Sequence, residues 1–99
     1  MCGISGAWGQ NKQIDVLDIS KAMRKALHHR GPDSYGDWVD NKSNIALSHA
    51  RLSIIDLSDA GHQPMISPNG KLILSFNGEI YNHYELRELV EKYNSYKSW

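Results

Sequence analysis

The sequence has a single cysteine, Cys2, and this scarcity excludes several classes of protein. One thiol cannot form an internal disulfide, and it cannot build a zinc site from paired Cys-x-x-Cys motifs. The five histidines lack the spacing that metal ligands on one helix or strand would have. We therefore expect neither a disulfide scaffold nor a metal centre.

A charge surplus and long apolar runs are missing as well. Eleven Lys and Arg balance eleven Asp and Glu, so no basic surplus is available for nucleic acid or for anionic lipid. No apolar run approaches the length of a membrane span, and no basic segment of the signal-peptide kind opens the chain. We expect a cytoplasmic protein that binds neither nucleic acid nor membrane.

The residues that are present predict one folded domain, since 40% of the 99 positions are hydrophobic and 22% are charged. Apolar periodicity predicts a helix over 18–29, which Gly31-Pro32 ends. Residues 2–8 are predicted to form a short strand that contains two glycines, and residues 37–40 and 44–50 to form two strands joined by a turn at 41–43.

The second half of the chain has weaker signals. Residues 51–63 fit neither period and are predicted to form an ordered loop. A hairpin is predicted over 64–76, with its turn at 68–70. Asn82 has the character of an N-cap, and an apolar helical stripe follows it, formed by Leu86, Leu89, Val90 and Tyr93. The order of elements predicts an α+β fold with antiparallel strands, in which each helix covers one sheet face.

Cys2 directly follows the initiator Met1, so removal of one residue would make it the amino terminus. A terminal cysteine carries both a thiol and a free α-amine, whose unperturbed pKa is about 7.7–8.0. The neutral amine can accept the thiol proton, so that one residue supplies nucleophile and base. The alternative is that Cys2 is only a small buried hydrophobe.

Two further stretches contain candidate site residues. In FNGEIYN, Asn77 and Gly78 place an amide side chain beside an unhindered N–H, a pair of donors that suits an oxyanion; the alternative is a simple turn. In HARLSIIDLS, Arg51 ends a predicted strand and could bind a carboxylate through two hydrogen bonds; the alternative is a surface arginine.

A third stretch, HHRGPD, is interpreted as architecture beside a site rather than as chemistry. Gly31-Pro32 supplies a sharp turn. The charged or polar side chains of His29, Arg30 and Asp33 could hold the loop together through hydrogen bonds.

Four collinear stretches together resemble the amino-terminal glutaminase domain of glutamine-hydrolysing asparagine synthetases: MCGISG, HHRGPDSYG, HARLSIIDLSDAGHQPM and FNGEIYNHYELR. These enzymes are class II glutamine amidotransferases, which use an N-terminal nucleophile. The resemblance implies that Cys2, after loss of Met1, attacks the side-chain amide of L-glutamine and forms a glutamyl thioester. It implies that the Asn77 side chain and the Gly78 N–H form the oxyanion hole.

The resemblance also implies how glutamine is held. Arg51 would bind the α-carboxylate, and Glu79 would contact the amino end. The backbone of Leu52, Ser53, Ile54 and Ile55 would line the same pocket. In the family, an aspartate in a Ser-Asp-Thr-Glu-like segment also binds the amine; Asp56 and Asp59 do not match that segment.

The implied fold is an αββα sandwich, with two antiparallel sheets between helical layers, of which residues 1–99 would be the N-terminal part. The sequence contains no SGG-type loop for the phosphates of ATP, so the synthetase domain, with its ATP and Mg, is expected to be absent from this chain. No cofactor is expected here. Missing strands would leave sheet edges exposed for a synthetase partner or for self-association.

Two functions follow from these observations. The first is glutamine hydrolysis that supplies ammonia for asparagine synthesis. The second is a truncated, non-catalytic remnant that acts only as a folding or interaction module.

Overall fold

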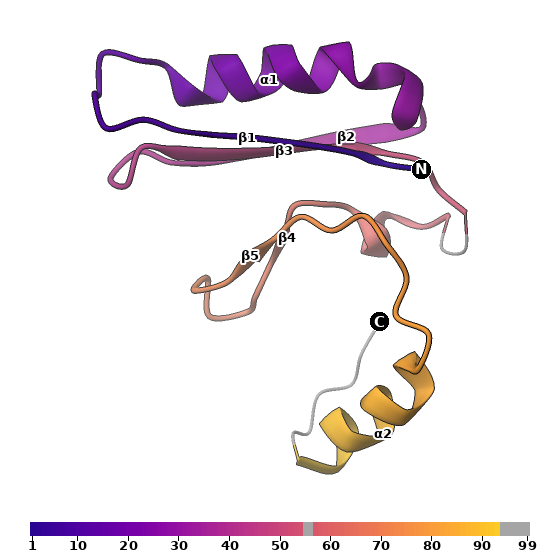
Figure 1. Cartoon of the computed structure of the whole chain (residues 1–99). Coiled ribbons are helices and arrows are strands. Elements are labelled where there is room, and N and C mark those ends of the chain that lie inside the picture. The colour runs from indigo at the N-terminus through magenta and orange to yellow at the C-terminus, as the bar shows by residue number, and fades with distance from the viewer. Residues whose placement is uncertain (55–56, 94–99) are drawn as a thin grey trace.

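The computed structural model describes residues 1–54 and 57–93, and it consists of two antiparallel sheets and two helices (Figure 1). The elements in chain order are β1 (Gly3–Trp8), α1 (Val16–Ala26), the 3₁₀ helix η1 (His28–Arg30), β2 (Ser34–Asp40), β3 (Ile45–Arg51), the 3₁₀ helix η2 (Asp59–Gly61), β4 (Met65–Ile66), β5 (Ile73–Leu74) and α2 (His83–Tyr93). Helix α1 covers one face of the larger sheet, and the β4–β5 hairpin lies on the other side (Figure 1). The predicted α+β class is confirmed.

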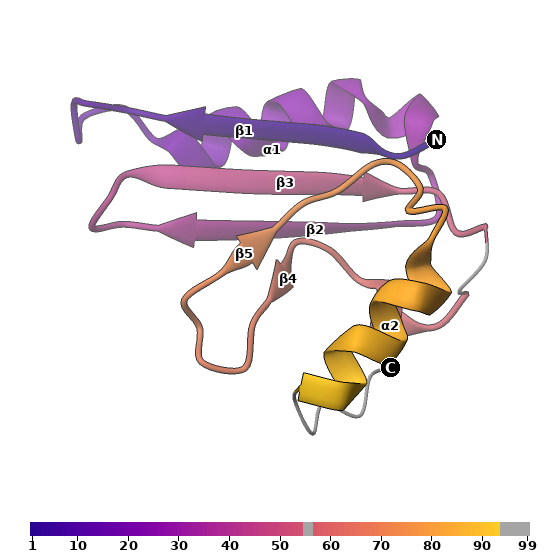
Figure 2. The same ribbon diagram turned by 60° about the horizontal axis from the view of Figure 1, so that its bottom comes forward.

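The larger sheet has the order β1-β3-β2, with both pairs antiparallel (Figure 2). Strand β3 is therefore central, and Gly3 at the start of β1 pairs with Ala50 near the end of β3. This register places Cys2, one residue before β1, beside Arg51, the last residue of β3. The pairing of β1 with β3 thus brings two predicted site residues, Cys2 and Arg51, close together.

Helix α1 begins at Val16, two residues before the predicted start, because Asp15 caps it: the Asp15 carboxylate accepts the Asp18 N–H at 3.0 Å. The last turn contains Arg24 and Lys25, whose charges suit the negative end of the helix dipole. The helix ends at Ala26, earlier than predicted, and the chain continues through η1 toward the Gly-Pro turn.

Small and polar residues fill the interface between α1 and the sheet. Val16 and Ala46 are buried, and so are three serines. The Ser5 hydroxyl donates to the Ser20 carbonyl at 3.0 Å, and the Ser20 hydroxyl donates to Ser48 Oγ at 2.8 Å. These bonds satisfy the buried hydroxyls, whose desolvation would otherwise be costly. Small side chains therefore allow helix and sheet to approach closely.

An ion pair closes one end of this interface. Arg24 Nε and Nη2 donate to the two carboxylate oxygens of Asp37 at 2.8 and 3.1 Å, and the guanidinium lies over the Tyr35 ring. Burial by itself raises the pKa of Asp37, but the hydrogen bonds from Arg24 and Ser48, with the nearby positive charges, outweigh it and lower that pKa. The pair joins α1 to β2.

Replacing Asp37 with asparagine is expected to lower the free energy of unfolding at neutral pH by about 1–3 kcal/mol, because Arg24 loses its charged acceptor. The pKa of Asp37 in the folded chain lies below its unfolded value of about 3.9. The stability contributed by the charged carboxylate is therefore complete when the pH is above the unfolded pKa, and it is lost as the pH falls through the folded pKa. Urea titrations at pH 7 and in acid should therefore show the wild type approaching D37N as pH falls. Glu88→Gln, on the exposed part of α2, is the matched control; an equal deficit at both pH values would contradict this account.

The β4–β5 hairpin has the predicted turn but shorter strands than expected. Gly70 adopts a φ of 70°, and its N–H donates to the Ser67 carbonyl at 2.8 Å. Each strand has two residues, because beyond Leu74 the Phe76 N–H donates to the side chain of Gln63 rather than to a neighbouring strand. The hairpin therefore ends close to the candidate site.

Helix α2 begins at His83, directly after the predicted N-cap residue Asn82, whose carbonyl accepts the Leu86 N–H at 3.1 Å. It has 11 residues, as α1 has. Among residues 1–54 and 57–93, no helix is long and apolar enough to cross a membrane.

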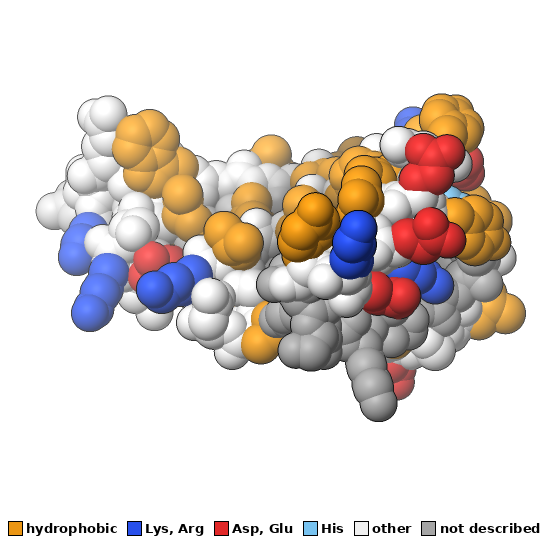
Figure 3. All heavy atoms as spheres, turned by 90° about the horizontal axis from the view of Figure 1, so that it is seen from below, with side chains coloured by type: hydrophobic (Ala, Val, Ile, Leu, Met, Phe, Trp, Pro, Cys, Tyr) orange, Lys and Arg blue, Asp and Glu red, His pale blue; other side chains and the backbone are white. Residues whose placement is uncertain are grey.

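The expectation that α2 covers a sheet face is wrong. The helix buries none of its residues, and Figure 1 places it away from the larger sheet. Its apolar stripe is exposed; Leu89, for example, is 52% exposed, and Figure 3 shows apolar side chains at the surface on this side of the molecule. A stripe indicates which side of a helix is apolar, but it does not determine which surface lies against it.

Candidate active site

Cys2 lies against the turn that follows β3. Its Sγ accepts the Leu52 N–H at 3.3 Å, and its S–H faces the Leu52 carbonyl at 3.6 Å, although 50 positions separate the two residues. The side chain is half-buried. These two contacts fix the thiol at one side of a hollow instead of burying it in the core, as the hydrophobe interpretation would require.

Asp33 supports the same turn from the other side. Its N–H donates to the Arg51 carbonyl at 3.0 Å, and its carboxylate accepts the Ser53 N–H at 2.7 Å. The prediction that this loop is structural is confirmed for Asp33. In the described part of the chain, the side chains of His29 and Arg30 form no such hydrogen bond.

Arg51 is buried, with 9% of its surface exposed, so the alternative of a surface arginine is wrong. Its Nη1 donates to the Ser58 carbonyl at 2.7 Å. Gly61 lies so close to the guanidinium that a Cβ at this position would overlap Nη2. The loop through η2 therefore fixes the direction of the Arg51 side chain.

The opposite wall of the hollow comes from the segment after β5. Asn77, Gly78 and Glu79 line it, and in the described residues neither the Asn77 amide nor the Gly78 N–H has a hydrogen-bond partner. Two adjacent donors without partners can donate hydrogen bonds to an oxygen atom of a ligand.

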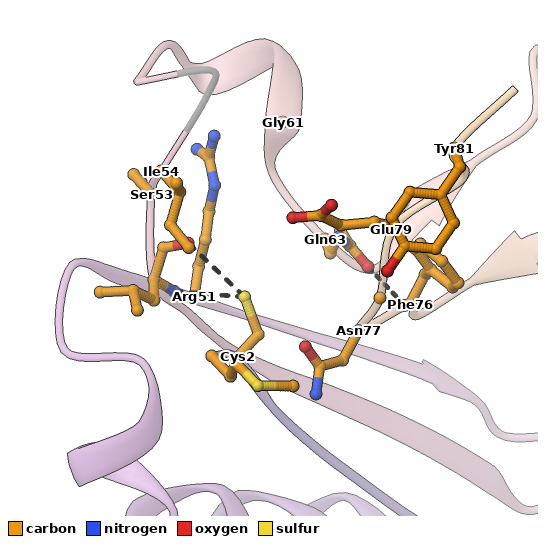
Figure 4. Close-up of a pocket in the computed structure, with 13 residues that line it drawn as sticks. Cys2, Arg51, Ser53, Ile54, Gly61, Gln63, Phe76, Asn77, Glu79 and Tyr81 are labelled. Carbon is orange, nitrogen blue, oxygen red and sulfur yellow. Dashed lines mark hydrogen bonds between the residues drawn. The ribbon is translucent and has the colours of Figure 1, made fainter. Parts of the chain in front are cut away.

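The two walls enclose a hollow of about 540 Å³, in which Figure 4 shows Cys2 and Asn77 close together and the Glu79 carboxylate on the other side from Arg51. The predicted site residues that line it are Cys2, Arg51, Leu52, Ser53, Ile54, Asn77, Gly78 and Glu79. Ile55 lies outside the described residues. A cation and an anion on opposite walls match the carboxylate and ammonium groups of a free amino acid.

Five residues that the sequence did not single out for the site also line the hollow: Met1, Gly61, Gln63, Phe76 and Tyr81. Gly61 and Gln63 belong to the predicted loop over 51–63. Met1 is next to Cys2, and Phe76 and Tyr81 lie within the FNGEIYN stretch, so their position in the sequence could have indicated their place. Contacts across the loop have no local signal in the sequence.

His49 connects the larger sheet to the segment after β5. The side chain is fully buried, and its Nδ1 bonds the Ser75 hydroxyl at 2.9 Å. Burial lowers the pKa of His49, and the neighbouring Arg51 and His62 lower it further. The ring is therefore neutral near pH 7. Among the described residues, no group of three His, Cys, Asp or Glu is placed to hold a metal ion.

Comparison with known proteins shows which family this chain belongs to. Residues 1–98 match the model of the family described as glutamine amidotransferase domain. Similar relatives include glutamine-hydrolysing asparagine synthetases of Brassica oleracea and Sandersonia aurantiaca, each 41% identical over 93 residues. These alignments cover 89% of this chain but only 15% and 16% of those proteins, so the chain spans a small part of the relatives' length. No solved structure matches the chain.

Proposed function

The chain belongs to the glutamine amidotransferase domain family, and from this premise we propose that it hydrolyses the side-chain amide of L-glutamine. The observation that carries the proposal is the shared hollow. A thiol, a buried cation and two donors without partners come from segments far apart in sequence and line one cavity, as acyl transfer to an amino-acid substrate requires.

In the proposed reaction, Cys2 acts after Met1 has been removed. Met1 is 64% exposed, which suits removal by an aminopeptidase. The new α-amine accepts the thiol proton, and Sγ then bonds to the amide carbon of glutamine while the carbonyl electron pair moves to oxygen. The Asn77 side chain and the Gly78 N–H donate to that oxyanion.

The tetrahedral intermediate then collapses. The carbonyl re-forms, the C–N bond breaks, and ammonia leaves with the proton that the α-amine returns, so that a γ-glutamyl thioester remains on Cys2. Water attacks this thioester through the same oxyanion arrangement. The C–S bond breaks, and glutamate and the free thiol are released.

Glutamine is held at its other end by complementary charges. Arg51, fixed by Ser58 and Gly61, binds the α-carboxylate, and Glu79 binds the α-ammonium. Backbone groups of the turn after β3 complete the pocket, and Asp33 keeps that turn in place. With its other end held in this way, the side-chain amide of glutamine would lie between Cys2 and Asn77.

The ammonia is proposed to serve asparagine synthesis in a synthetase domain or subunit, because the relatives named above are asparagine synthetases. The ATP and Mg²⁺ of that reaction belong to the synthetase half in this proposal. L-Glutamine is the partner that the hollow of this chain would bind.

Intact-mass measurement after incubation with an electrophilic glutamine analogue tests the proposal. The expected product has lost the mass of Met1 and gained one adduct, and excess L-glutamine should slow its formation. Cys2→Ala is the control and should gain no adduct. A wild-type chain that lacks Met1 and still remains unlabelled would contradict catalysis by this chain.

A second function, an interaction module without catalysis, is favoured by one observation. The exposed apolar side chains of the second half lie on β5, the following segment and α2, and they include Leu74, Tyr81, Tyr84, Leu86, Leu89 and Val90. Apolar surface of this extent suits burial against a partner chain. The unlabelled outcome of the mass measurement would support this function.

A further inference from the structure

We propose that Gln63 is a positioning residue, which holds the donors Asn77 and Gly78 at the correct distance from Cys2. This inference rests on the proposed glutamine hydrolysis and assigns to Gln63 a role in the geometry of the oxyanion site. It follows from one hydrogen bond that joins the two walls of the hollow.

The Phe76 N–H donates to Oε1 of Gln63 at 2.6 Å, a bond drawn as a dashed line in Figure 4. Only the oxygen of the side-chain amide can accept an N–H, so the orientation of the Gln63 amide is determined by its partner. Phe76 directly precedes Asn77. The bond therefore fixes the backbone at the entry to the oxyanion donors.

The segment 75–79 has few other attachments. Strand β5 ends at Leu74, so the segment has no partner strand. In the described residues, its other hydrogen bond to the rest of the fold joins the Ser75 hydroxyl to His49. That bond holds the segment at its first residue, and the bond from Gln63 holds it one residue before the donor pair.

Gln63 itself is well fixed, which a positioning residue must be. Gly36 of β2 approaches its carbonyl so closely that a Cβ on Gly36 would overlap that oxygen. The preceding residue, His62, donates its N–H to the Asp59 carbonyl at 3.0 Å and so continues η2. Helix η2 ends with Gly61, which lies beside Arg51. Gln63 thus connects the wall that contains Arg51 to the opposite wall, which contains Asn77 and Gly78.

The consequence for catalysis is a matter of distance. Oxyanion donors act only when they lie about 2.7–3.1 Å from the developing charge, and removing one donor costs about 10²–10³ in kcat. A misplacement of about 1 Å can cost about 10². Loss of the Gln63 acceptor should therefore lower kcat more than it changes KM, because Arg51, which is proposed to bind the α-carboxylate, lies on the other wall and is held independently by Ser58.

The variants that separate the possibilities are Gln63→Met, which keeps the length of the side chain but replaces the acceptor oxygen with a weakly accepting sulfur, and Gln63→Glu, which keeps an acceptor oxygen. Gln13→Met, at an exposed position, is the matched control. In Q63M we expect kcat for glutamine hydrolysis to fall about 10- to 100-fold, with KM within about threefold of wild type. Alkylation of Cys2 by iodoacetamide, which needs no oxyanion site, should keep its rate. Q63E should recover most of kcat.

Equal losses in Q63M and Q63E, or a change confined to KM, would overturn the proposal, since Gln63 would then contact substrate or only fill space. Amide hydrogen exchange gives a readout that does not depend on turnover. The Phe76 amide should exchange at least about tenfold faster in Q63M than in wild type, Q63E or Q13M, while the β3 amides keep their rates. An unchanged exchange rate of the Phe76 amide in Q63M would overturn the proposal, even if the wild-type chain proved inactive. An inactive wild type that shows the expected exchange pattern would contradict only the proposed glutamine hydrolysis.

Discussion

Replacing Gly31 with alanine is expected to lower the free energy of unfolding by about 3 kcal/mol, near the upper end of the range for overpacked sites. The reason is space rather than backbone conformation, because the φ of Gly31, −151°, is available to any residue. A Cβ at this position would overlap the Ala50 carbonyl and the Arg51 N–H of the central strand. Backbone atoms cannot rotate away as a flexible side chain can, so the loop before β2 must separate from β3.

Chemical denaturation at neutral pH, followed by circular dichroism, measures this effect. Gly70→Ala is the matched control, because Gly70 has a φ of 70° with no atom near its Cβ position. It should cost only about 1–2 kcal/mol, the strain of a left-handed conformation. If G31A were no less stable than G70A, the close approach of the loop to β3 would not contribute to stability.

The same contact connects stability to the site. Gly31 lies against the backbone of Arg51, and Asp33, two residues later, holds the turn on which Cys2 rests. A loop displaced by G31A would release both supports. We therefore expect labelling of Cys2 by the glutamine analogue to slow in any fraction of G31A that still folds.

Much of the fold could be predicted from local patterns. The strand at residues 2–8, the helical stripe of α1 and the hairpin turn at Pro68-Asn69-Gly70 were predicted, because each of these structures depends on neighbouring residues. The register of β1 on β3 and the position of α2 could not be predicted in this way. Both depend on which surfaces meet, and that information is spread over distant parts of the chain.

The candidate site could likewise be predicted only in part from the sequence. Cys2, Arg51 and Asn77 were identified in short motifs, and the structure brings all three to one hollow. The contacts that orient them, from Asp33 and from Gln63, join segments distant in sequence. The sequence indicated Asp33 as a support of its loop but not its partner Ser53, and it gave no signal for the bond from Gln63.

Replacing Asn77 with alanine is expected to lower kcat for glutamine hydrolysis by about 10²–10³, which is the usual loss when one oxyanion donor is removed. The Gly78 N–H would remain, so activity should be reduced and not abolished. Asn77→Asp separates the donor from the shape of the side chain, because a carboxylate has nearly the same size but cannot donate to an oxyanion. We expect N77D to be at least as impaired as N77A, with the negative charge adding repulsion.

Steady-state ammonia release as a function of glutamine concentration measures both parameters. KM should stay within a few-fold of wild type in both variants, because the proposed contacts to the α-carboxylate and α-ammonium come from Arg51 and Glu79. Asn41→Ala, in the exposed turn between β2 and β3, is the matched control and should keep wild-type kcat. A loss of less than about fivefold in N77A would mean that Asn77 does not stabilise the oxyanion. A large rise in KM with unchanged kcat would instead place its amide on the bound substrate, and the hollow would then be a binding site whose donors do not act in the transition state.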